Sequence, residues 1–408
     1  MKHDMPIVGG MQFQGVRTEN CLVCGDVAHR HEFELVGAHA CLRLICSICG
    51  RSVIEDLPHG HALFYPFSVD EATGELNGGE IARGWYGEEF AKAVRYPATE
   101  EPSLEIQEHR PCSGEIVFLP CIDYLYGHSL LKLLQAGEHL DAGFDVVVLV
   151  PRYMAWMVPE SVAQTWIVDV PLRHGQLWFP SLSKRLREKF SAFDCVRISP
   201  AHPHPAAGDP ERFTKVAPYE RQVPCGRRVT FVWRDDRLWA WDRQNIWLKV
   251  PRLRFLGRWI QKQRVLRLFD DLKRRGLDFV PTVVGVGSSP GFPGWVEDRI
   301  VSPPVTREVE MRICEVYAQS LAVVGVHGSN MLLPSWHALS TFDLMPVSRW
   351  GNFAQDILYR DTEPRRSAAR LRYVALSTPI SVLAAQVASM LEWHQEIFRN
   401  FESRGQRP

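Results

Sequence analysis

Four consecutive polar or small residues, His327-Gly328-Ser329-Asn330, stand between two apolar runs and supply an imidazole, a hydroxyl and a side-chain amide. Residues 321–324 suit a strand buried on both faces that breaks at Gly325, and residues 331–339 suit a helix. A turn between a strand and a helix presents free backbone N–H groups that suit phosphate. Taken singly, each residue could simply form the turn or cap the helix. Together they predict a ligand site at the carboxyl end of a strand.

Two CxxC pairs, each followed by a glycine, form a second motif: Cys21 with Cys24, and Cys46 with Cys49. In such a turn two thiolates point at one centre, and the glycine permits the backbone that brings N–H groups to the sulfurs. Two turns of this kind complete a closed tetrahedral site, which predicts structural Zn²⁺ in an N-terminal ribbon. Two alternatives remain: Cys41 or a nearby histidine replaces one ligand, or the pairs act as redox dithiols.

Two further strand ends in the second half carry groups that suit phosphate. Arg234 and Arg237 follow one predicted strand, and guanidinium groups bind diphosphate bidentately. Their alternative role is an ion-pair cluster with the two aspartates between them. Gly285 and Gly287 end another strand, without the third glycine of a dinucleotide-binding fingerprint. In one parallel sheet, these two turns and the turn at His327 would meet at a single edge.

Apolar runs that alternate with helical segments must position these residues, and they predict parallel, doubly wound sheets in two halves. The predicted strands are 115–120, 145–150, 166–170 and 194–198 in the first half, and 229–233, 279–287, 342–346 and 372–376 in the second. Predicted helices include 81–94, 130–140, 265–275 and 306–320. We assign 1–55 to the zinc ribbon, 56–112 to a linker or insert, 113–222 to a first Rossmann-like domain, and 223–408 to a second with a long terminal helix.

The first half has its own polar loop after the strand 115–120, where Asp123 and His128 stand at a natural cleft position. The alternative role for His128 is to start the following helix. Residues 51–112 contain a loop with His59 and His61, to which we assign no chemistry because exposed histidine pairs usually bind no metal.

The chain has 408 residues, with 47 basic and 47 acidic side chains. This balance argues against electrostatically driven binding of nucleic acid. The ten cysteines fit a cytoplasmic protein with one metal site and several buried thiols better than a disulfide scaffold. The N-terminus is polar, and the long uncharged stretch 374–391 is interrupted by Pro379, so we expect neither a secretory signal nor a membrane span.

Residues 310–334 resemble the His-Gly-Ala-Gly segment of glycosyltransferase family 61, and residues 342–346 stand where that family has an (I/V)-E-(I/L)-x-P strand end. Ser329 and Asn330 replace the Ala-Gly of that family. The segment 233–237 matches its arginine motif loosely and equally resembles the phosphate-binding arginine of O-fucosyltransferases. The resemblance spans about residues 227–350. The two wound halves and long final helix resemble the GT-B fold.

This resemblance implies an enzyme that transfers a sugar from a nucleotide-diphosphate donor to an acceptor hydroxyl without a catalytic metal, because positive side chains and helix dipoles stabilise the leaving diphosphate. Asn352, Gln355 and Asp356 would extend the donor pocket. The acceptor-side base would be Asp123 or His128, and His327 joins them in the catalytic set. The donor-binding set is Arg234, Arg237, Gly285, Gly287, His327, Gly328, Ser329, Asn330 and Asp343.

Two other functions compete with this one. The first is a non-catalytic scaffold with a zinc ribbon and a degenerate GT-B body. The second is a nucleotide-binding enzyme of another type, such as an epimerase or dehydrogenase, which the missing third glycine disfavours. In any case the ribbon could dock a protein partner. The donor sugar remains open, and so does the acceptor, which could be a glycan, a lipid or a protein.

Overall fold

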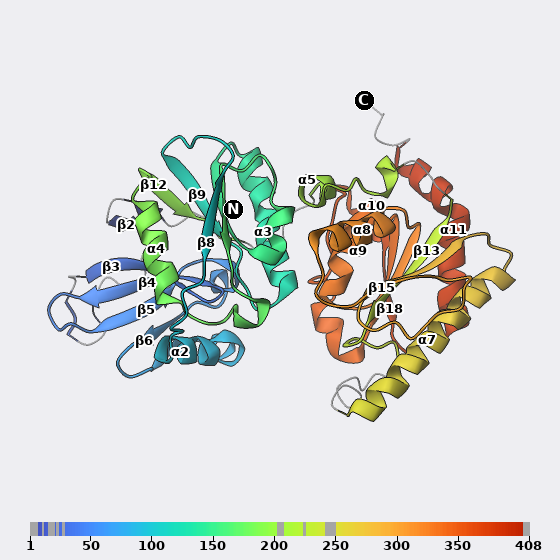
Figure 1. Ribbon diagram of the computed structural model, residues 1–408, viewed down its shortest axis with the longest axis horizontal. Coiled ribbons are helices and arrows are strands. Elements are labelled where there is room, and N and C mark those ends of the chain that lie inside the picture. The colour runs from blue at the N-terminus through green and yellow to red at the C-terminus, as the bar shows by residue number, and fades with distance from the viewer. Residues whose placement is uncertain are drawn as a thin grey trace. The chain divides into compact units, whose positions relative to one another are not determined.

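The computed structural model is a mixed α/β structure with three sheets (Figure 1). It describes residues 7–9, 12–14, 21, 24–26, 29–201, 208–222, 226–240 and 250–402. The chain forms two compact units, Met1–Pro205 and Ala206–Pro408. The boundary predicted from the sequence, after residue 222, adjoins residues 223–225, which lie outside the described part. None of the described helices has the length and apolar character needed to cross a bilayer.

A seven-stranded sheet forms the centre of the first unit, in the order β2-β1-β12-β9-β10-β11-β8. Its four middle strands are parallel, and antiparallel strands complete both edges. The strand order reverses between β9 and β12, because β10 and β11 lie on one side of β9 and β12 on the other. The bounds are β1 Ile7–Gly9, β2 Gln12–Gln14, β8 Leu104–Glu108, β9 Glu115–Pro120, β10 Asp145–Pro151, β11 Gln164–Val168 and β12 Cys195–Ile198.

Two α-helices connect the parallel strands of this sheet: α3, Tyr126–Asp141, follows β9, and α4, Pro180–Phe190, precedes β12. Beyond β12 lies the short helix α5, Pro210–Thr214, which belongs to the second unit.

A five-stranded antiparallel sheet, β3 to β7 in chain order, completes the first unit. It shares a hydrophobic core with the larger sheet: the rings of Phe33 and Phe118 meet edge to face at 6.1 Å. Glu34 is buried between the sheet and α4, where Arg187 pairs with it at 2.6 Å. The strands are β3 His29–Val36, β4 His39–Cys46, β5 Ser52–Asp56, β6 Phe67–Asp70 and β7 Leu76–Gly78, so the sheet continues beyond residue 55.

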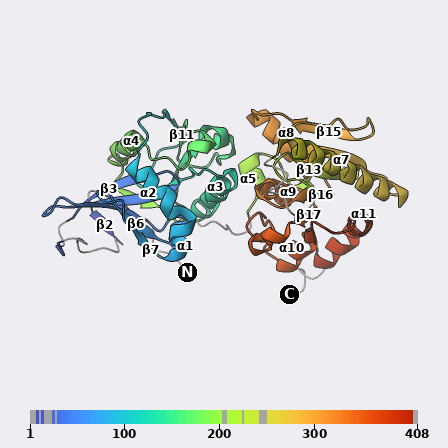
Figure 2. The ribbon, with the colours of Figure 1, turned by 90° about the horizontal axis from the view of Figure 1, so that it is seen from below.

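Helical turns follow this sheet and cover one of its faces (Figure 2). They begin with α1, Glu80–Ala82, and end with α2, Glu88–Arg95. Between them, Arg83–Gly87 form a π-helical turn. The segment 56–112, predicted as a linker or insert, therefore contains regular structure that packs on the five-stranded sheet.

The second unit contains one six-stranded sheet in which every strand is parallel to its neighbours. Its order is β15-β14-β13-β16-β17-β18, which is 3-2-1-4-5-6 when the strands are numbered along this unit. The direction of winding reverses between β13 and β16. The bounds are β13 Arg228–Arg234, β14 Val280–Val286, β15 Glu297–Val301, β16 Ala322–Val326, β17 Ser340–Met345 and β18 Leu371–Ala375.

Helices cover both faces of this sheet, because its strands are apolar on both sides. The long helices α7, Pro251–Arg274, and α11, Ile380–Glu402, pack against each other and on one face (Figure 1). On the other face lie α8, Arg307–Ala318, and α9, Leu332–His337. Short α10, Pro364–Arg370, precedes β18.

Candidate functional site

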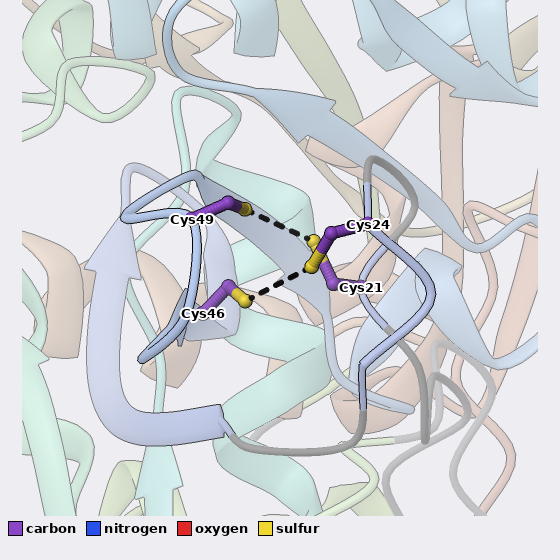
Figure 3. A group of neighbouring side chains, drawn as sticks. All are labelled: Cys21, Cys24, Cys46 and Cys49. Atoms are coloured by element: carbon purple, nitrogen blue, oxygen red, sulfur yellow. Dashed lines mark hydrogen bonds between the residues drawn. The ribbon is translucent and has the colours of Figure 1, made fainter.

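Four cysteine side chains converge beside the five-stranded sheet (Figure 3). Cys46 ends β4 and Cys49 stands in the following turn, while Cys21 and Cys24 come from the segment before β3. The Sγ atoms of Cys21 and Cys49 are 3.6 Å apart, as are those of Cys24 and Cys46, and all four lie within 4.8 Å of one another. These distances are far too long for a disulfide, whose sulfurs are about 2.05 Å apart.

The two cysteine turns have the same backbone. The N–H of Gly25 donates to the carbonyl of Cys21, and the N–H of Gly50 donates to that of Cys46, both at 2.9 Å. Each glycine has a positive φ, of 76° and 70°, which favours glycine over other residues. Backbone N–H groups of Cys49 and Ile48 hold the pKa of the Cys46 thiol below its usual value, whereas burial and the neighbouring thiols raise the pKa of Cys24 and Cys49.

This arrangement can hold a single metal ion such as zinc. A tetrahedral zinc site with Zn–S bonds of about 2.3 Å separates its sulfurs by roughly 3.8 Å. The observed pair distance of 3.6 Å is close to that value. Four thiolates would fill the coordination shell, so the chemistry such an ion supplies here is structural.

In the second unit, the three turns named from the sequence lie at one edge of the sheet. β13 lies between β14 and β16, and all three run in the same direction. The turns after these strands carry Arg234–Arg237, Gly285–Ser289 and His327–Asn330, respectively. This edge contains the point at which the strand order reverses, where open α/β sheets bind ligands.

His327 and Asp343 form a buried pair at this edge. The imidazole Nδ1 and the Asp343 Oδ2 are 2.6 Å apart, and each residue is only 1% exposed. Burial holds the pKa of Asp343 above its usual value, although His327 opposes this effect. The second ring nitrogen, Nε2, makes no hydrogen bond with a described residue and lies 3.5 Å from the Asp356 Oδ2. The pair therefore fixes the ring and directs Nε2 toward Asp356.

Arg237 crosses from the β13 turn to the His327 turn. Its Nη1 donates to the His327 carbonyl at 2.8 Å. The Arg237 guanidinium also occupies the space that a side chain at position 328 would need, because a Cβ added to Gly328 would lie 1.7 Å from Nη1. The φ of Gly328 is 149°, so glycine meets both a steric and a backbone requirement there. Burial lowers the pKa of Arg237 from its usual value, and the nearby Asp356 and Asp236 oppose this effect.

The structure places Arg234 differently. Its guanidinium makes two hydrogen bonds of 2.8 Å to the carboxylate of Asp236, which is the ion-pair alternative that the sequence left open. Asp235 accepts the backbone N–H of Ser288 at 3.0 Å and would be within 3.0 Å of a Cβ on Gly287. The Gly285–Gly287 turn is thus joined to the β13 turn through Asp235.

The remaining predicted residues begin the connection to α9. A short 3-10 turn, Ser329–Met331, precedes α9, in place of the predicted continuous helix 331–339. The amide nitrogen of Asn330 donates to the Val326 carbonyl at 3.1 Å, so this side chain closes the end of β16. Because α9 has only six residues, its dipole can contribute little to anion binding.

In the first unit, Asp123 lies just after β9 and is 2% exposed. Its Oδ2 is 3.2 Å from Nζ of Lys132, and its Oδ1 is 3.5 Å from Nδ1 of His128. Burial disfavours the charged carboxylate, but Lys132 and His128 outweigh burial and hold the pKa of Asp123 well below its usual value. The His128 side chain is 29% exposed, so of these two predicted bases it is the one that solvent reaches.

Two histidines to which the sequence assigned no chemistry lie at the same strand ends. His59 Nδ1 donates at 2.9 Å to the Ser199 carbonyl, just beyond β12. The His61 ring lies 5.1 Å from that of His128 and stacks on Tyr86 from the π-helical turn at 4.7 Å. π-Helical turns are rare and recur at functional sites. The contact of His59 with Ser199 joins residues 140 positions apart, so no local pattern could reveal it.

The buried histidines predict acid sensitivity of the first unit. Burial and the charge of Lys132 lower the pKa of His59 from 6.5 to about 3. Between these pH values the unfolded chain holds the proton and the folded chain does not, so stability is complete above pH 6.5 and falls as the pH approaches 3. The loss for His59 is at most about 5 kcal/mol.

Urea unfolding at several pH values tests this prediction. His59→Gln should flatten the fall of the unfolding free energy between pH 6.5 and 4, whereas His174→Gln, a half-buried control in the same unit, should keep the wild-type slope. Equal slopes for wild type and His59→Gln would contradict a neutral buried imidazole.

A charged cleft of about 330 Å³ lies elsewhere in the second unit. Arg360 and Arg370 line it and donate to the carbonyls of Ala338 and Leu339, which precede β17, so the cleft is at the opposite end of that strand from Asp343. Both arginines also pair with Glu220. The charged groups that line the cleft are therefore paired with one another, and these ion pairs hold residues 208–222 against the sheet.

Comparison of the chain with protein-family models, with curated proteins and with solved structures gives no match.

Proposed function

We propose that the protein is a glycosyltransferase of the GT-B fold, whose second unit is a Rossmann-like domain that binds a nucleotide-sugar donor. The observation that carries this proposal is the meeting of Arg237, His327 and Asp343 at the reversal point of an all-parallel sheet. The strand order 3-2-1-4-5-6 is that of dinucleotide-binding sheets. The first unit would be a second Rossmann-like domain, and it would present the acceptor.

Arg237 is the group we assign to the donor diphosphate. One of its N–H groups is used on the His327 carbonyl, and the others remain to contact phosphate oxygens. Its charge, held in a half-buried position, would stabilise the negative charge that develops on the leaving diphosphate. Arg234 would act indirectly, by placing Asp236 and the β13 turn.

His327 would bind the donor through Nε2. Because Nδ1 is paired with Asp343, Nε2 is the ring nitrogen left for a ligand, and it is buried before one binds. A ribose or sugar hydroxyl could donate to this atom, with Asp356 beside it. Because Gly328 has no side chain, Arg237 can lie beside it, and this would be the role of Gly328.

His128 is the base we assign to the acceptor hydroxyl. It is the more exposed member of its pair with Asp123, which would orient the ring and stabilise the imidazolium. Asp123 itself is enclosed by Lys132 and backbone. The ion at the four cysteines would be zinc, with a structural role.

Thermal shift with UDP, GDP, CMP and their common sugar conjugates, and with NAD as a control, tests the proposal. A ligand that binds only the folded state raises the melting temperature. Arg237→Met should abolish the shift, whereas Arg221→Met, whose arginine pairs with Asp209 and Glu211, should retain it. A shift with NAD alone would favour an oxidoreductase. No shift with any nucleotide would favour the scaffold alternative.

A further inference from the structure

The first turns of α7 carry apolar side chains on a face that no described residue covers. Further along the helix, Leu268 and Leu272 are fully buried in the core on its inner side. Near its start, Phe255 is 69% exposed and Trp259 is 52% exposed, and Leu256 between them is 39% exposed. Residues four apart lie on the same side of a helix. α7 is therefore apolar on two sides, of which only the inner one belongs to the core.

The inner side of these first turns is fixed to the body of the second unit. A Cβ added to Gly257 would lie 2.6 Å from Cδ1 of Leu238, so helix and body are in close contact there. Arg258 pairs with Asp235 at 3.4 Å, and Lys262 donates to the Pro290 carbonyl at 3.3 Å. The outward direction of Phe255 and Trp259 is thus set by packing.

The charge of this segment is strongly one-sided. Between Pro251 and Phe269 the sequence contains Arg252, Arg254, Arg258, Lys262, Arg264 and Arg267, and no acidic residue. The whole chain, in contrast, has equal numbers of basic and acidic residues. Of these, Arg254 and Arg267 are exposed, so cations flank the exposed aromatic and aliphatic side chains, and the surface complements an anionic one.

We propose that the N-terminal half of α7 docks on an anionic lipid bilayer, with Phe255, Leu256 and Trp259 inserted at the level of the headgroups. Aromatic and leucine side chains on one side of a helix, flanked by arginine and lysine, are the composition of helices that lie in the membrane interface. The cations contact lipid phosphates, and each adds affinity for an anionic surface. The helix lies on the bilayer and does not cross it.

A second copy of the chain fits this surface less well. A symmetric dimer places the same patch on both sides of its interface, so the exposed Arg254 and Arg267 of one copy would face the same cations of the other. Nucleic acid would use the cations but leaves Leu256 without a role. Docking on lipid is independent of sugar transfer, so the two proposals can fail separately.

Co-sedimentation of the full chain with vesicles tests the inference. We expect binding to vesicles of phosphatidylcholine with one third phosphatidylglycerol, weaker binding at high salt, and none to pure phosphatidylcholine. The double variant Phe255→Ser/Trp259→Ser should bind vesicles about tenfold more weakly than the wild type, or more weakly still. Arg267→Gln, at an exposed arginine, should weaken binding about fivefold.

Trp393→Ser provides a matched control. Trp393 is 57% exposed on α11, close to the value for Trp259, but its neighbours on that helix include Glu392 and Glu396. It should bind vesicles as the wild type does. Absence of sedimentation, equal binding to both kinds of vesicle, or equal loss in the two tryptophan variants would overturn the proposal. So would a wild-type dimer that becomes monomeric in the double variant without any lipid binding.

Discussion

Cys46→Ser is expected to release the metal ion from the four-cysteine site and to lower the melting temperature of the first unit by about 10 °C or more. Cys46 is 1% exposed and is the last residue of β4. The loss would reach the interior because β3 and β4 share one hydrophobic core with β9 and β11. Structural zinc sites contribute roughly 10–16 kcal/mol of binding free energy, so even partial coupling to folding is large.

Metal content by mass spectrometry and melting by calorimetry measure this effect. Cys195→Ser is the matched control, because Cys195 begins β12 in the same unit and lies outside the cluster. It should retain one equivalent of metal and nearly the wild-type melting temperature. Stoichiometric metal in purified Cys46→Ser would show that this thiol is not a ligand. Metal-free wild-type protein with unchanged stability would remove the structural role.

Asp343→Ala is expected to destabilise the second unit by about 3–5 kcal/mol and to abolish nucleotide binding. The buried imidazole of His327 would lose the carboxylate 2.6 Å away and retain no partner on Nδ1 among the described residues. The β17 strand would also lose a side chain that is 1% exposed. Asp343→Asn keeps an oxygen for the imidazole and removes only the charge, so it should cost about half as much.

Urea unfolding and calorimetric titration with a nucleotide identified in the thermal-shift panel separate the two effects. Asp278→Ala, at an exposed aspartate before β14, should change neither quantity. If Asp343→Asn binds nucleotide as the wild type does, the charge of this carboxylate has no part in the site. If Asp343→Ala is as stable as Asp278→Ala, the pair with His327 contributes nothing to folding.

The buried parallel strands could be predicted from the sequence to within about two residues at each end, as 166–170 for β11, Gln164–Val168, shows. The segment 115–120 is β9, and 229–233 became β13, Arg228–Arg234. Such strands are covered on both sides, so each is an uninterrupted apolar run. The edge strands β2 and β8, and β1 beside β2, were missed, because β1 and β2 have only three residues each and β8 is largely exposed.

Helices were harder to predict where their surroundings are unusual. The predicted helix 265–275 begins in fact at Pro251, since the first turns of α7 are apolar on the outside and do not follow a single stripe. The predicted helix 81–94 contains the π-helical turn Arg83–Gly87, which a periodic pattern does not reveal. In both cases tertiary packing, and not local preference, decides the outcome.

The functional sites, like the strands and helices, could be predicted only in part. Arg237 and His327 follow β13 and β16, and Asp343 lies in the next strand, β17, so topology alone suggests that they meet. Which aspartate receives Arg234 depends on the conformation of one turn, and the sequence could not choose between phosphate and ion pair. The approach of His61 to His128 depends on a loop folded over β12, for which the sequence has no signal.

The shared core of the two sheets in the first unit limits how this protein can be divided. A shortened chain that begins after β5 would uncover Phe118 and Trp166, which pack in one cluster with Phe33 and Leu42. Conversely, β3 and β4 grafted with the cysteine turns onto another scaffold would carry an uncovered apolar face and the buried charge of Glu34. The metal site therefore cannot be transferred to another protein by itself, because it depends on the core that the two sheets share.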